Sequence, residues 1–392
     1  MNDREETSTS RRSFVQVAGA GVAWGLAKLA AGDGSRQIQG FEEEQADPDA
    51  ADGWQPVSDR RIRVGIAGFG YCGFGAEFGF QDHPNVEVVA VTDLIPDRCA
   101  ELAKACRCEK TYPSCEEMIQ DDRIEAVFVA TDAPSHARSS VDAPKHGKHV
   151  ACAVPAVFGS IEDADRLLDA VKKSGLAYMM FETSYYHADL HAWRQQYSAG
   201  GLGRLVYSEG EYYHYFGEPL PSYKGWRVGL PPQWYPTHSN AYFVGVTGGS
   251  FTEVSCMGMP SIVGHLQPAN NSYQNPFGTE IALFRTSEGG MARMAVSWDT
   301  PASGGEMGRV RGQKEGRASL RTHRPPLPPG VSAGGHGGSH GYLMSEFVES
   351  ILQNRKPAVD VAQSLAMTVG GIVAHQSALK DGELTKIPQY AL

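Results

Sequence analysis

The chain has little clustered positive charge and no cysteine pattern that suggests a metal site or a disulfide framework. Lys and Arg number 35 against 45 Asp and Glu, which gives a formal net charge of -10, and no basic block follows the first thirty residues. Nucleic-acid and anionic-membrane surfaces need such blocks. The seven cysteines include no CxxC pair and no Cys/His array that would bind zinc. We therefore expect no nucleic-acid partner and no metal site.

The chain also lacks an apolar run long enough to cross a membrane. The best candidate, residues 17–31, is rich in Ala and Gly and is interrupted by Lys28, whereas a stable span needs about 20 strongly apolar residues. The pair Arg11-Arg12 precedes this run, which is typical of a twin-arginine export signal. We expect no transmembrane span, although a retained tether stays open because no clear small-x-small cleavage site follows.

Length and composition predict how the rest of the chain is organised. A chain of 392 residues is long enough for two domains, and 45 Gly with 23 Pro is typical of an α/β protein with many turns. The acidic segment before the first strand predicts a solvated linker. The predicted segments are an export signal at 1–34, a linker at 35–60, a dinucleotide-binding domain at 61–180 and a substrate domain at 181–392. This organisation predicts a periplasmic or otherwise exported protein.

A glycine-rich loop follows the first predicted strand. The run of residues 61–67 suits a buried parallel strand, and it leads directly into a GxGxxG motif. Gly68 permits the tight turn, Gly70 lets the backbone approach a pyrophosphate, and Gly73 allows close packing of the following helix. The predicted cofactor loop consists of Gly68, Phe69, Gly70, Tyr71, Cys72 and Gly73.

An acidic residue stands where a dinucleotide site needs one. The second predicted strand, residues 86–92, ends in Asp93, about 20 residues after the glycine motif. A carboxylate there binds both ribose hydroxyls and repels a 2′-phosphate, so the sequence favours NAD over NADP.

Later strands place further loops beside this site. Strands at 126–130, 148–152 and 177–181 alternate with helical spacers such as 161–173, which predicts a doubly wound parallel sheet. Ligands of such sheets lie at the carboxyl ends of the strands. The additional predicted cofactor-binding residues are Thr131, His136, Pro155 and Glu182. Glu182 could equally form a buried ion pair.

These motifs together resemble the glucose-fructose oxidoreductase/inositol dehydrogenase (Gfo/Idh/MocA) family. The resemblance rests on the order of the glycine motif, Asp93, the strand end with Thr131 and His136, and the segment Gly147-Lys148-His149-Val150 before Pro155. It implies an α/β fold with an N-terminal Rossmann domain, a doubly wound parallel sheet, and a C-terminal α/β domain with an open, mostly antiparallel sheet. It also implies NAD(P), a sugar or polyol substrate, and a homo-oligomer.

The chain departs from that family at one position used in catalysis. The family usually reads Glu-Lys-Pro and uses the Lys, whereas this chain reads Ala153-Val154-Pro155. Val154 cannot take the proton of a hydroxyl group that is being oxidised. The NAD-dependent α-N-acetylgalactosaminidase branch also lacks the Lys and is similar at Val154-Pro155-Ala156, Trp226-Arg227 and the segment 235–238. Ala153 replaces the Glu of that branch.

That branch implies which residues carry catalysis. His238 follows Pro236 and opens a segment expected to face the cleft, and His and Tyr serve as acids or bases when their pKa values are tuned. Tyr212 and His214 alternate on a strand and share one face. The candidate catalytic residues are His238, Tyr235, Tyr186, His214 and Tyr212. The segment from His336 to His340 favours a flexible loop over a metal site, because its context is rich in Gly and no carboxylate accompanies it.

The predicted export limits which reactions on NAD are expected. No pool of NAD and NADH is maintained outside the cytoplasm, so we expect a redox-neutral cycle on tightly bound NAD. The resemblance implies transient oxidation at sugar C3, elimination and hydration of a glycoside. The alternatives are a sugar dehydrogenase, a sugar-to-sugar oxidoreductase, and a sugar-binding protein that has lost catalysis.

Overall fold

A sheet of six parallel strands forms the first part of the fold. The computed structural model describes residues 50–70, 73–301, 305–314 and 324–392, so the predicted export signal and most of the linker lie outside the described residues. The strands lie in the order β3-β2-β1-β4-β5-β6, and every pairing is parallel. They are β1 (Ile62–Ala67), β2 (Val86–Thr92), β3 (Thr111–Tyr112), β4 (Ala126–Val129), β5 (His149–Cys152) and β6 (Tyr178–Met180).

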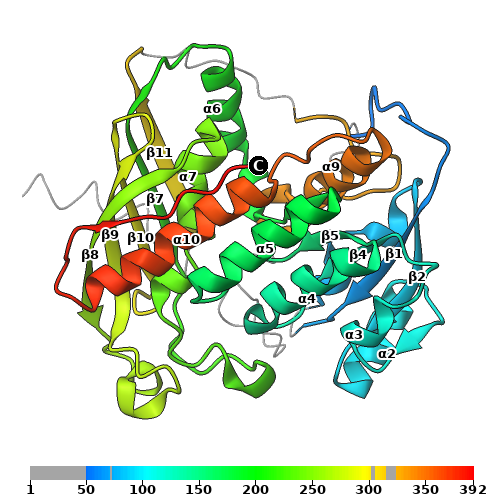
Figure 1. The fold of residues 1–392 in the computed structure, drawn as a ribbon, viewed down its shortest axis with the longest axis horizontal. Helices are drawn as coiled ribbons and strands as arrows, with labels where there is room; N and C mark the ends of the chain where they lie inside the picture. Colours follow the sequence, from blue (N-terminus) through cyan, green and yellow to red (C-terminus); the bar gives the residue numbers. More distant parts are fainter. Residues whose placement is uncertain (1–49, 71–72, 302–304, 315–323) are drawn as a thin grey trace, which may run out of the picture. The chain divides into compact units, whose positions relative to one another are not determined.

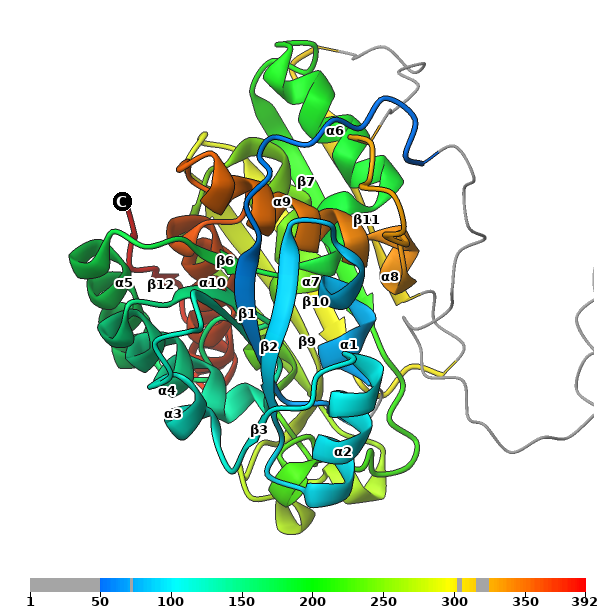
Figure 2. The ribbon, with the colours of Figure 1, turned by 90° about the vertical axis from the view of Figure 1, so that its right-hand side faces the viewer.

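Helices cover both faces of this sheet, as the doubly wound prediction requires. They are α1 (Phe74–Glu77), α2 (Pro96–Ala105), α3 (Cys115–Met118), α4 (His136–Asp142) and α5 (Ile161–Ser174). Figure 2 shows α3, α4 and α5 on one side of the strands and α1 and α2 on the other. The first two strands are almost continuously apolar because they are buried between these layers.

Local signals in the sequence set the ends of α5. The Ser160 side chain accepts a hydrogen bond from the Asp163 N–H at 3.1 Å, which satisfies one free donor of the first turn. Gly175 ends the helix with φ 66, a conformation in which glycine is favoured. Acidic residues in the first turn and lysines in the last turn match the helix dipole.

The second sheet is mixed, and most of its pairings are antiparallel. Its strand order is β11-β7-β10-β9-β8-β12, with only the β7–β10 pairing parallel. The strands are β7 (Leu205–Tyr213), β8 (Phe251–Pro260), β9 (Phe277–Thr286), β10 (Met291–Ser297), β11 (Gly305–Gly312) and β12 (Thr385–Lys386). This sheet and the parallel sheet confirm the predicted α/β fold class.

The remaining helices pack against the two sheets. They are α6 (Ala188–Ser198), α7 (Thr237–Thr247), α8 (Gly335–Gly338), α9 (His340–Leu352) and α10 (Val361–Ala378). Helix α7 packs on β7, and α10 packs on β8 while also contacting α5 of the first layer (Figure 1). Helix α9 meets the first layer, because Phe347 contacts the rings of Phe80 and Phe181. None of the described helices is long and apolar enough to cross a membrane.

A buried histidine beside β2 makes the fold sensitive to acid. His83 is 3% exposed, and its Nδ1 accepts a hydrogen bond from the Asn85 N–H at 3.0 Å. Burial lowers the pKa of His83 from 6.5 to about 4. Below pH 6.5 His83 therefore binds a proton in the unfolded chain but stays neutral in the folded chain. The stability of the fold falls as the pH drops toward 4.

We expect His83 to contribute a loss of about 2 kcal/mol in the free energy of unfolding between pH 7.5 and pH 5. Urea unfolding at the two pH values measures the change. The variant His83→Asn keeps a hydrogen-bond acceptor but does not titrate in this range, so its loss should be smaller by that amount. Equal losses in both proteins would show that His83 is protonated without cost in the folded chain.

Candidate functional site

The glycine loop after β1 is held close to the neighbouring strand. Gly68 adopts φ 97, and a Cβ at this position would collide with the backbone of Ala130. Gly70 adopts φ 73, and among the described residues a Cβ at this position would have only the Cβ of Phe74 within 4 Å, at 3.7 Å. The loop therefore keeps a free backbone surface at Gly70, as a pyrophosphate would require. The predicted residues Tyr71 and Cys72 lie outside the described residues.

The close packing assigned to Gly73 belongs to Gly75 instead. Gly73 precedes α1 with φ 76, and a Cβ there would approach the Phe69 ring only to 3.5 Å. A Cβ on Gly75 would collide with the carbonyl oxygen of Gly68. The prediction for Gly73 is wrong in this respect because α1 begins only at Phe74 and approaches the loop one residue later.

Asp93 braces the glycine loop from the end of β2. Its Oδ2 accepts a hydrogen bond from the Phe69 N–H at 2.8 Å, and its Oδ1 accepts one from the Ile95 N–H at 2.8 Å. Each carboxylate oxygen has a second lone pair. The arrangement therefore fixes the loop and leaves acceptors available for ribose hydroxyls.

His136 joins the loops that follow β4 and β5. It is 1% exposed, and its ring nitrogens lie 2.8 Å from the Pro155 carbonyl oxygen and 3.1 Å from that of Thr131. Burial lowers the pKa of His136, but the nearby Cys152 and the two carbonyls outweigh burial and raise it to about 9. The protein itself occupies both nitrogens, so His136 positions Thr131 and Pro155 and offers no group to a ligand.

The loop after β5 carries no group that could transfer a proton. Ala153 and Val154 are each 5% exposed, and the peptide between Val154 and Pro155 is cis. Where the family usually has Glu-Lys-Pro, this loop therefore has no ionisable side chain. Any acid or base must come from the following elements.

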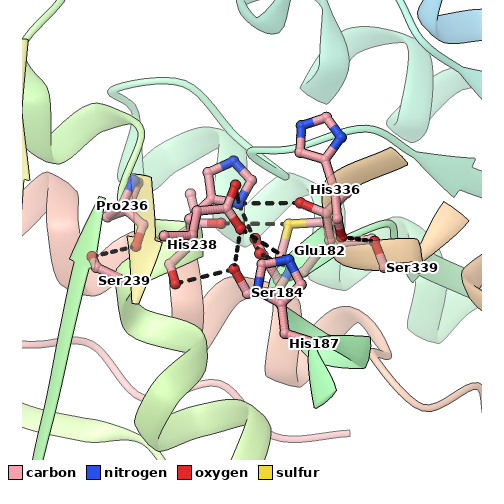
Figure 3. Close-up of polar contacts among 12 residues, drawn as sticks. Glu182, Ser184, His187, Pro236, His238, Ser239, His336 and Ser339 are labelled. Atoms are coloured by element: carbon pink, nitrogen blue, oxygen red, sulfur yellow. Dashed lines mark hydrogen bonds and ion pairs between the residues drawn. The ribbon is translucent and has the colours of Figure 1, made fainter. Parts of the chain in front are cut away.

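Two carboxylates and one imidazole converge next to this loop. His238 Nδ1 lies 2.9 Å from Glu182 Oε1 and 3.5 Å from Glu306 Oε1. Glu182 is fully buried, and His238 is 3% exposed. Figure 3 shows the side chains of Glu182, Ser184, His187 and His238 pointing toward one another. Since Nδ1 is engaged with the carboxylates, Nε2 is the ring nitrogen that can face a ligand.

Three separate elements supply this cluster. Glu182 follows β6 and caps the short 3₁₀ turn Thr183–Tyr186, where its Oε1 accepts a hydrogen bond from the Ser184 N–H at 2.9 Å. His238 lies in the first turn of α7, directly after Pro236 and Thr237. Glu306 lies at the start of β11 and pairs with Tyr212 of β7.

The charges of the cluster stabilise one another. Burial lowers the pKa of His238, but Glu182 and Glu306 outweigh burial and raise it to about 9. Burial raises the pKa of Glu182, and the charge and hydrogen bond of His238 reverse this, so its pKa lies below the usual value. Glu306 Oε2 accepts a hydrogen bond from the Ser184 Oγ–H at 2.7 Å and lies 3.4 Å from His187 Nε2.

Aromatic side chains surround His238. The ring centroids of Tyr212 and Tyr235 lie 4.5 and 5.6 Å from that of His238. The Arg227 guanidinium lies 4.1 Å from the Trp226 ring centroid and 5.7 Å from that of Tyr235. Flat aromatic faces beside polar groups suit a sugar ring, which has both apolar C–H faces and hydroxyl edges.

The structure places the other predicted catalytic residues differently. His214 directly follows β7, and its ring centroid lies 6.0 Å from that of Tyr212. Burial, with smaller effects from Arg227 and His238, lowers the pKa of His214 to about 4. Tyr186 instead stacks on Tyr342 at 5.5 Å, and the Arg194 guanidinium lies 5.6 Å from its ring centroid. The catalytic role predicted for Tyr186 therefore does not fit, because the 3₁₀ turn directs its ring away from His238.

Several residues of the site were missed in the sequence. Glu306 sits in a glycine-rich segment, and only the pairing of β11 with β7 reveals its importance. His187 follows Tyr185 and Tyr186 in the sequence, but its contact with Glu306 depends on the fold.

The prediction of a flexible loop from His336 to His340 is also wrong. The segment forms α8 and the start of α9, and His336 Nδ1 lies 2.9 Å from His340 Nε2. Burial lowers the pKa of His336 well below its usual value, and the charges of His340 and His238 add to this shift. The segment therefore packs against the cluster around His238.

Comparisons with known proteins agree with this architecture. The Gfo/Idh/MocA model, described as an oxidoreductase family with an NAD-binding Rossmann fold, matches residues 62–182. A glycosyl hydrolase family 109 protein of Bacteroides thetaiotaomicron is 30% identical over 177 residues, which cover 43% of this chain and only 38% of that protein. A protein of the same name from Saccharopolyspora erythraea is 22% identical over 438 aligned positions, covering 97% of this chain and 94% of that protein.

A solved structure shows the same fold. Scyllo-inositol dehydrogenase from Lactobacillus casei, with bound NAD(H) and scyllo-inositol, is similar with a TM-score of 0.65 at 17% identity, covering 83% of this chain and 99% of that one. The glycine loop, the parallel sheet and the matched residues 62–182 show that this part of the chain is an NAD-binding Rossmann domain like that of the Gfo/Idh/MocA oxidoreductase family.

Proposed function

We propose that the chain is a carbohydrate-acting enzyme that uses tightly bound NAD in a redox-neutral cycle and cleaves a glycoside. The observation that carries the proposal is the Glu182–His238–Glu306 cluster, in which Glu182 lies two residues after β6, the last strand of the parallel sheet. It supplies proton-handling groups where the family's Lys is replaced by Val154. The relatives named glycosyl hydrolase family 109 support a glycoside as the substrate class.

The residues after β1 fit a dinucleotide. Gly68 cannot carry a side chain, Gly70 exposes backbone, and Asp93 holds the Phe69 N–H while keeping free lone pairs. These groups would hold the pyrophosphate and the ribose, and Thr131 and Pro155 would border the nicotinamide. Bound NAD would supply a hydride acceptor that later returns the hydride to the same sugar.

The net chemistry is hydrolysis, and its steps balance without an external oxidant. Bound NAD would accept the hydride from C3, and the chain's own groups would take the proton of the C3 hydroxyl. The C3 ketone acidifies the C2–H, so loss of that proton breaks the C1–O bond, and the leaving oxygen takes up a proton. Water then adds its oxygen to C1 and a proton to C2, and the returned hydride with one proton restores the C3 alcohol.

The chain's own side chains would move these protons. Nε2 of His238 can hold or transfer a proton at a substrate oxygen, while Glu182 fixes the ring through Nδ1. The Tyr212 and Tyr235 rings close the site beside His238 and can orient a sugar. Such positioning, with water largely excluded, strengthens each polar contact in the site.

Export is part of the proposal. The paired Arg11-Arg12 before the apolar run at 17–31 supports delivery by the twin-arginine route, which carries folded proteins. A protein outside the cytoplasm meets no maintained supply of NAD. A cycle that returns each hydride to the sugar avoids the need for one, and so export and the missing Lys favour the same reaction.

The test starts from the purified full chain. Denaturation should release about one equivalent of NAD, identified by mass, and the intact protein should cleave members of an aryl glycoside panel without added NAD. Bound NAD with net oxidation of a sugar, measured as NADH, would replace the proposal with a dehydrogenase. Hydride transfer from one labelled sugar to another would replace it with a sugar-to-sugar oxidoreductase, and the absence of any affinity for NAD would leave a sugar-binding protein.

A further inference from the structure

The Glu182–His238–Glu306 cluster has the geometry of a metal site. One ligand atom from each side chain lies within 4.8 Å of the other two, and His238 Nδ1 lies 2.9 Å from Glu182 Oε1 and 3.5 Å from Glu306 Oε1. Ligands about 2.0–2.1 Å from a tetrahedral zinc ion lie about 3.3 Å from one another. Small side-chain movements would therefore place all three atoms around one cation.

The hydrogen bonding of the cluster is incomplete without such an ion. Glu182 is fully buried and its carboxylate lies near the Thr237 hydroxyl, yet neither Glu182 Oε2 nor Thr237 Oγ1 makes a hydrogen bond of normal length and angle within the described residues. Native structures rarely leave a buried carboxylate oxygen without a partner. His187 Nε2 faces Glu306 Oε2 at 3.4 Å, and within the part of the chain that the structure describes it also lacks a hydrogen bond.

The negative charges of Glu182 and Glu306 also favour a bound cation. Glu182 and Glu306 both face one ring nitrogen of His238, and a buried carboxylate is costly unless it is paired or binds a metal. The Arg227 guanidinium lies instead against Trp226 and Tyr235. A divalent cation would neutralise two carboxylates at once.

We propose that Glu182, His238 and Glu306 bind one divalent transition-metal ion, with Zn²⁺ as the best-fitting ion. Two carboxylates and one imidazole form a borderline hard donor set, and three protein ligands leave a fourth position open to water or a substrate oxygen. His187 lies next to this position and orients Glu306. No local pattern marks this site, because its three ligands are far apart along the chain.

The ion would supply what the loop after β5 lacks. Val154 stands where the family uses a Lys, so no positive side chain from that loop can stabilise an oxygen that loses its proton. The metal ion would bind the substrate hydroxyl at its open coordination position and would polarise both this oxygen and the ketone formed from it. The neighbouring C–H would thereby become more acidic. This role rests on the proposed function, whereas the binding of the ion does not.

Metal binding can be measured without any enzyme assay. The full chain, treated with EDTA and then dialysed into chelator-free buffer, is titrated with Zn²⁺ against a chromophoric chelator, and Co²⁺ absorption reports the ligand geometry. We expect one tight site in the wild type. Glu182→Gln and Glu306→Gln should each weaken Zn²⁺ binding by at least about 100-fold, since each removes a direct ligand.

A matched control separates this site from general acidity. Glu253 forms an ion pair with Arg285 at 3.0 Å on the second sheet and does not belong to the cluster. We therefore expect Glu253→Gln to bind Zn²⁺ as the wild type does. Equal affinity in all four proteins, or no tight site in the wild type, would overturn the proposal. If the Gln variants do not fold, X-ray absorption of the Zn²⁺-loaded wild type decides: a shell of light N/O ligands with one imidazole supports the site, and its absence rejects it.

The two proposals fail in different ways. NAD content and glycoside cleavage are measured on the same preparations as Zn²⁺ binding. Bound NAD and cleavage that persist without any tight metal would reject the metal site and leave the proposed function intact. Tight Zn²⁺ binding that depends on Glu182 and Glu306, without glycoside cleavage, would support the metal site and reject the proposed function.

Discussion

Replacing His238 by Asn is expected to lower glycoside turnover by about 10²–10⁴-fold while NAD stays bound. Asn can still donate one hydrogen bond toward Glu182, but it has no nitrogen equivalent to Nε2 for proton transfer. His238→Ala is the less informative variant, because it removes the positively charged partner of Glu182 and Glu306 and should destabilise the fold by about 3–5 kcal/mol. Turnover and released NAD are measured on the same sample.

Tyr186→Phe is the matched control for this prediction. Its ring stacks on Tyr342 and His191, away from His238. Removing its hydroxyl should leave turnover within about twofold of the wild type, because the stacked ring is retained. A large loss in Tyr186→Phe would restore it as a candidate catalytic residue, and nearly full activity in His238→Asn would remove His238 from the mechanism.

The parallel sheet could be predicted from the sequence in detail. The strand expected at 86–92 is β2 with the same bounds, and those expected at 126–130 and 148–152 differ from β4 and β5 by one residue. Buried parallel strands are short apolar runs, and the glycine motif fixes where the first one ends. Local patterns are therefore sufficient for five of the six strands, whereas the two-residue edge strand β3 (Thr111–Tyr112) is too short to leave a pattern.

The candidate site was only partly predictable, for a physical reason. Two local patterns pointed to the site: the segment 235–238 and the alternation of Tyr212 with His214. The structure brings these residues near one another. Glu306 joins them only because β11 pairs antiparallel with β7 in one register. A register between distant strands follows from tertiary packing, and no local pattern around Glu306 encodes it.

Tyr186 shows the opposite error. Glu182, which follows β6, was expected to lie at the site, and it belongs to the cluster with His238 and Glu306. The chain then enters a 3₁₀ turn capped by that same carboxylate, and the turn rotates Tyr186 toward Arg194. The sequence predicts which strand end matters, but side-chain direction within the next turn depends on geometry that composition does not show.

Gly75→Ala should cause the largest combined loss of stability and cofactor binding. The added Cβ would collide with the carbonyl oxygen of Gly68 and come within 3.4 Å of the Ile66 side chain. Backbone cannot yield as a flexible side chain does, so α1 must move away from β1. We expect a loss of about 1–3 kcal/mol in the free energy of unfolding, and NAD affinity at least about 100-fold weaker, because Gly68 and Gly70 shift together.

Two further glycine variants separate these two effects. Gly70 and Gly147 have nearly the same φ, 73 and 74, and among the described residues a Cβ would meet the Phe74 Cβ at 3.7 Å at Gly70 and nothing within 4 Å at Gly147. Alanine at each should cost the same left-handed strain, about 1–2 kcal/mol. Only Gly70 lies in the loop that would approach the pyrophosphate, so only Gly70→Ala should weaken NAD binding in an equilibrium titration. Equal NAD affinity in the two variants would place the dinucleotide elsewhere, because the backbone strain is matched and only the position differs.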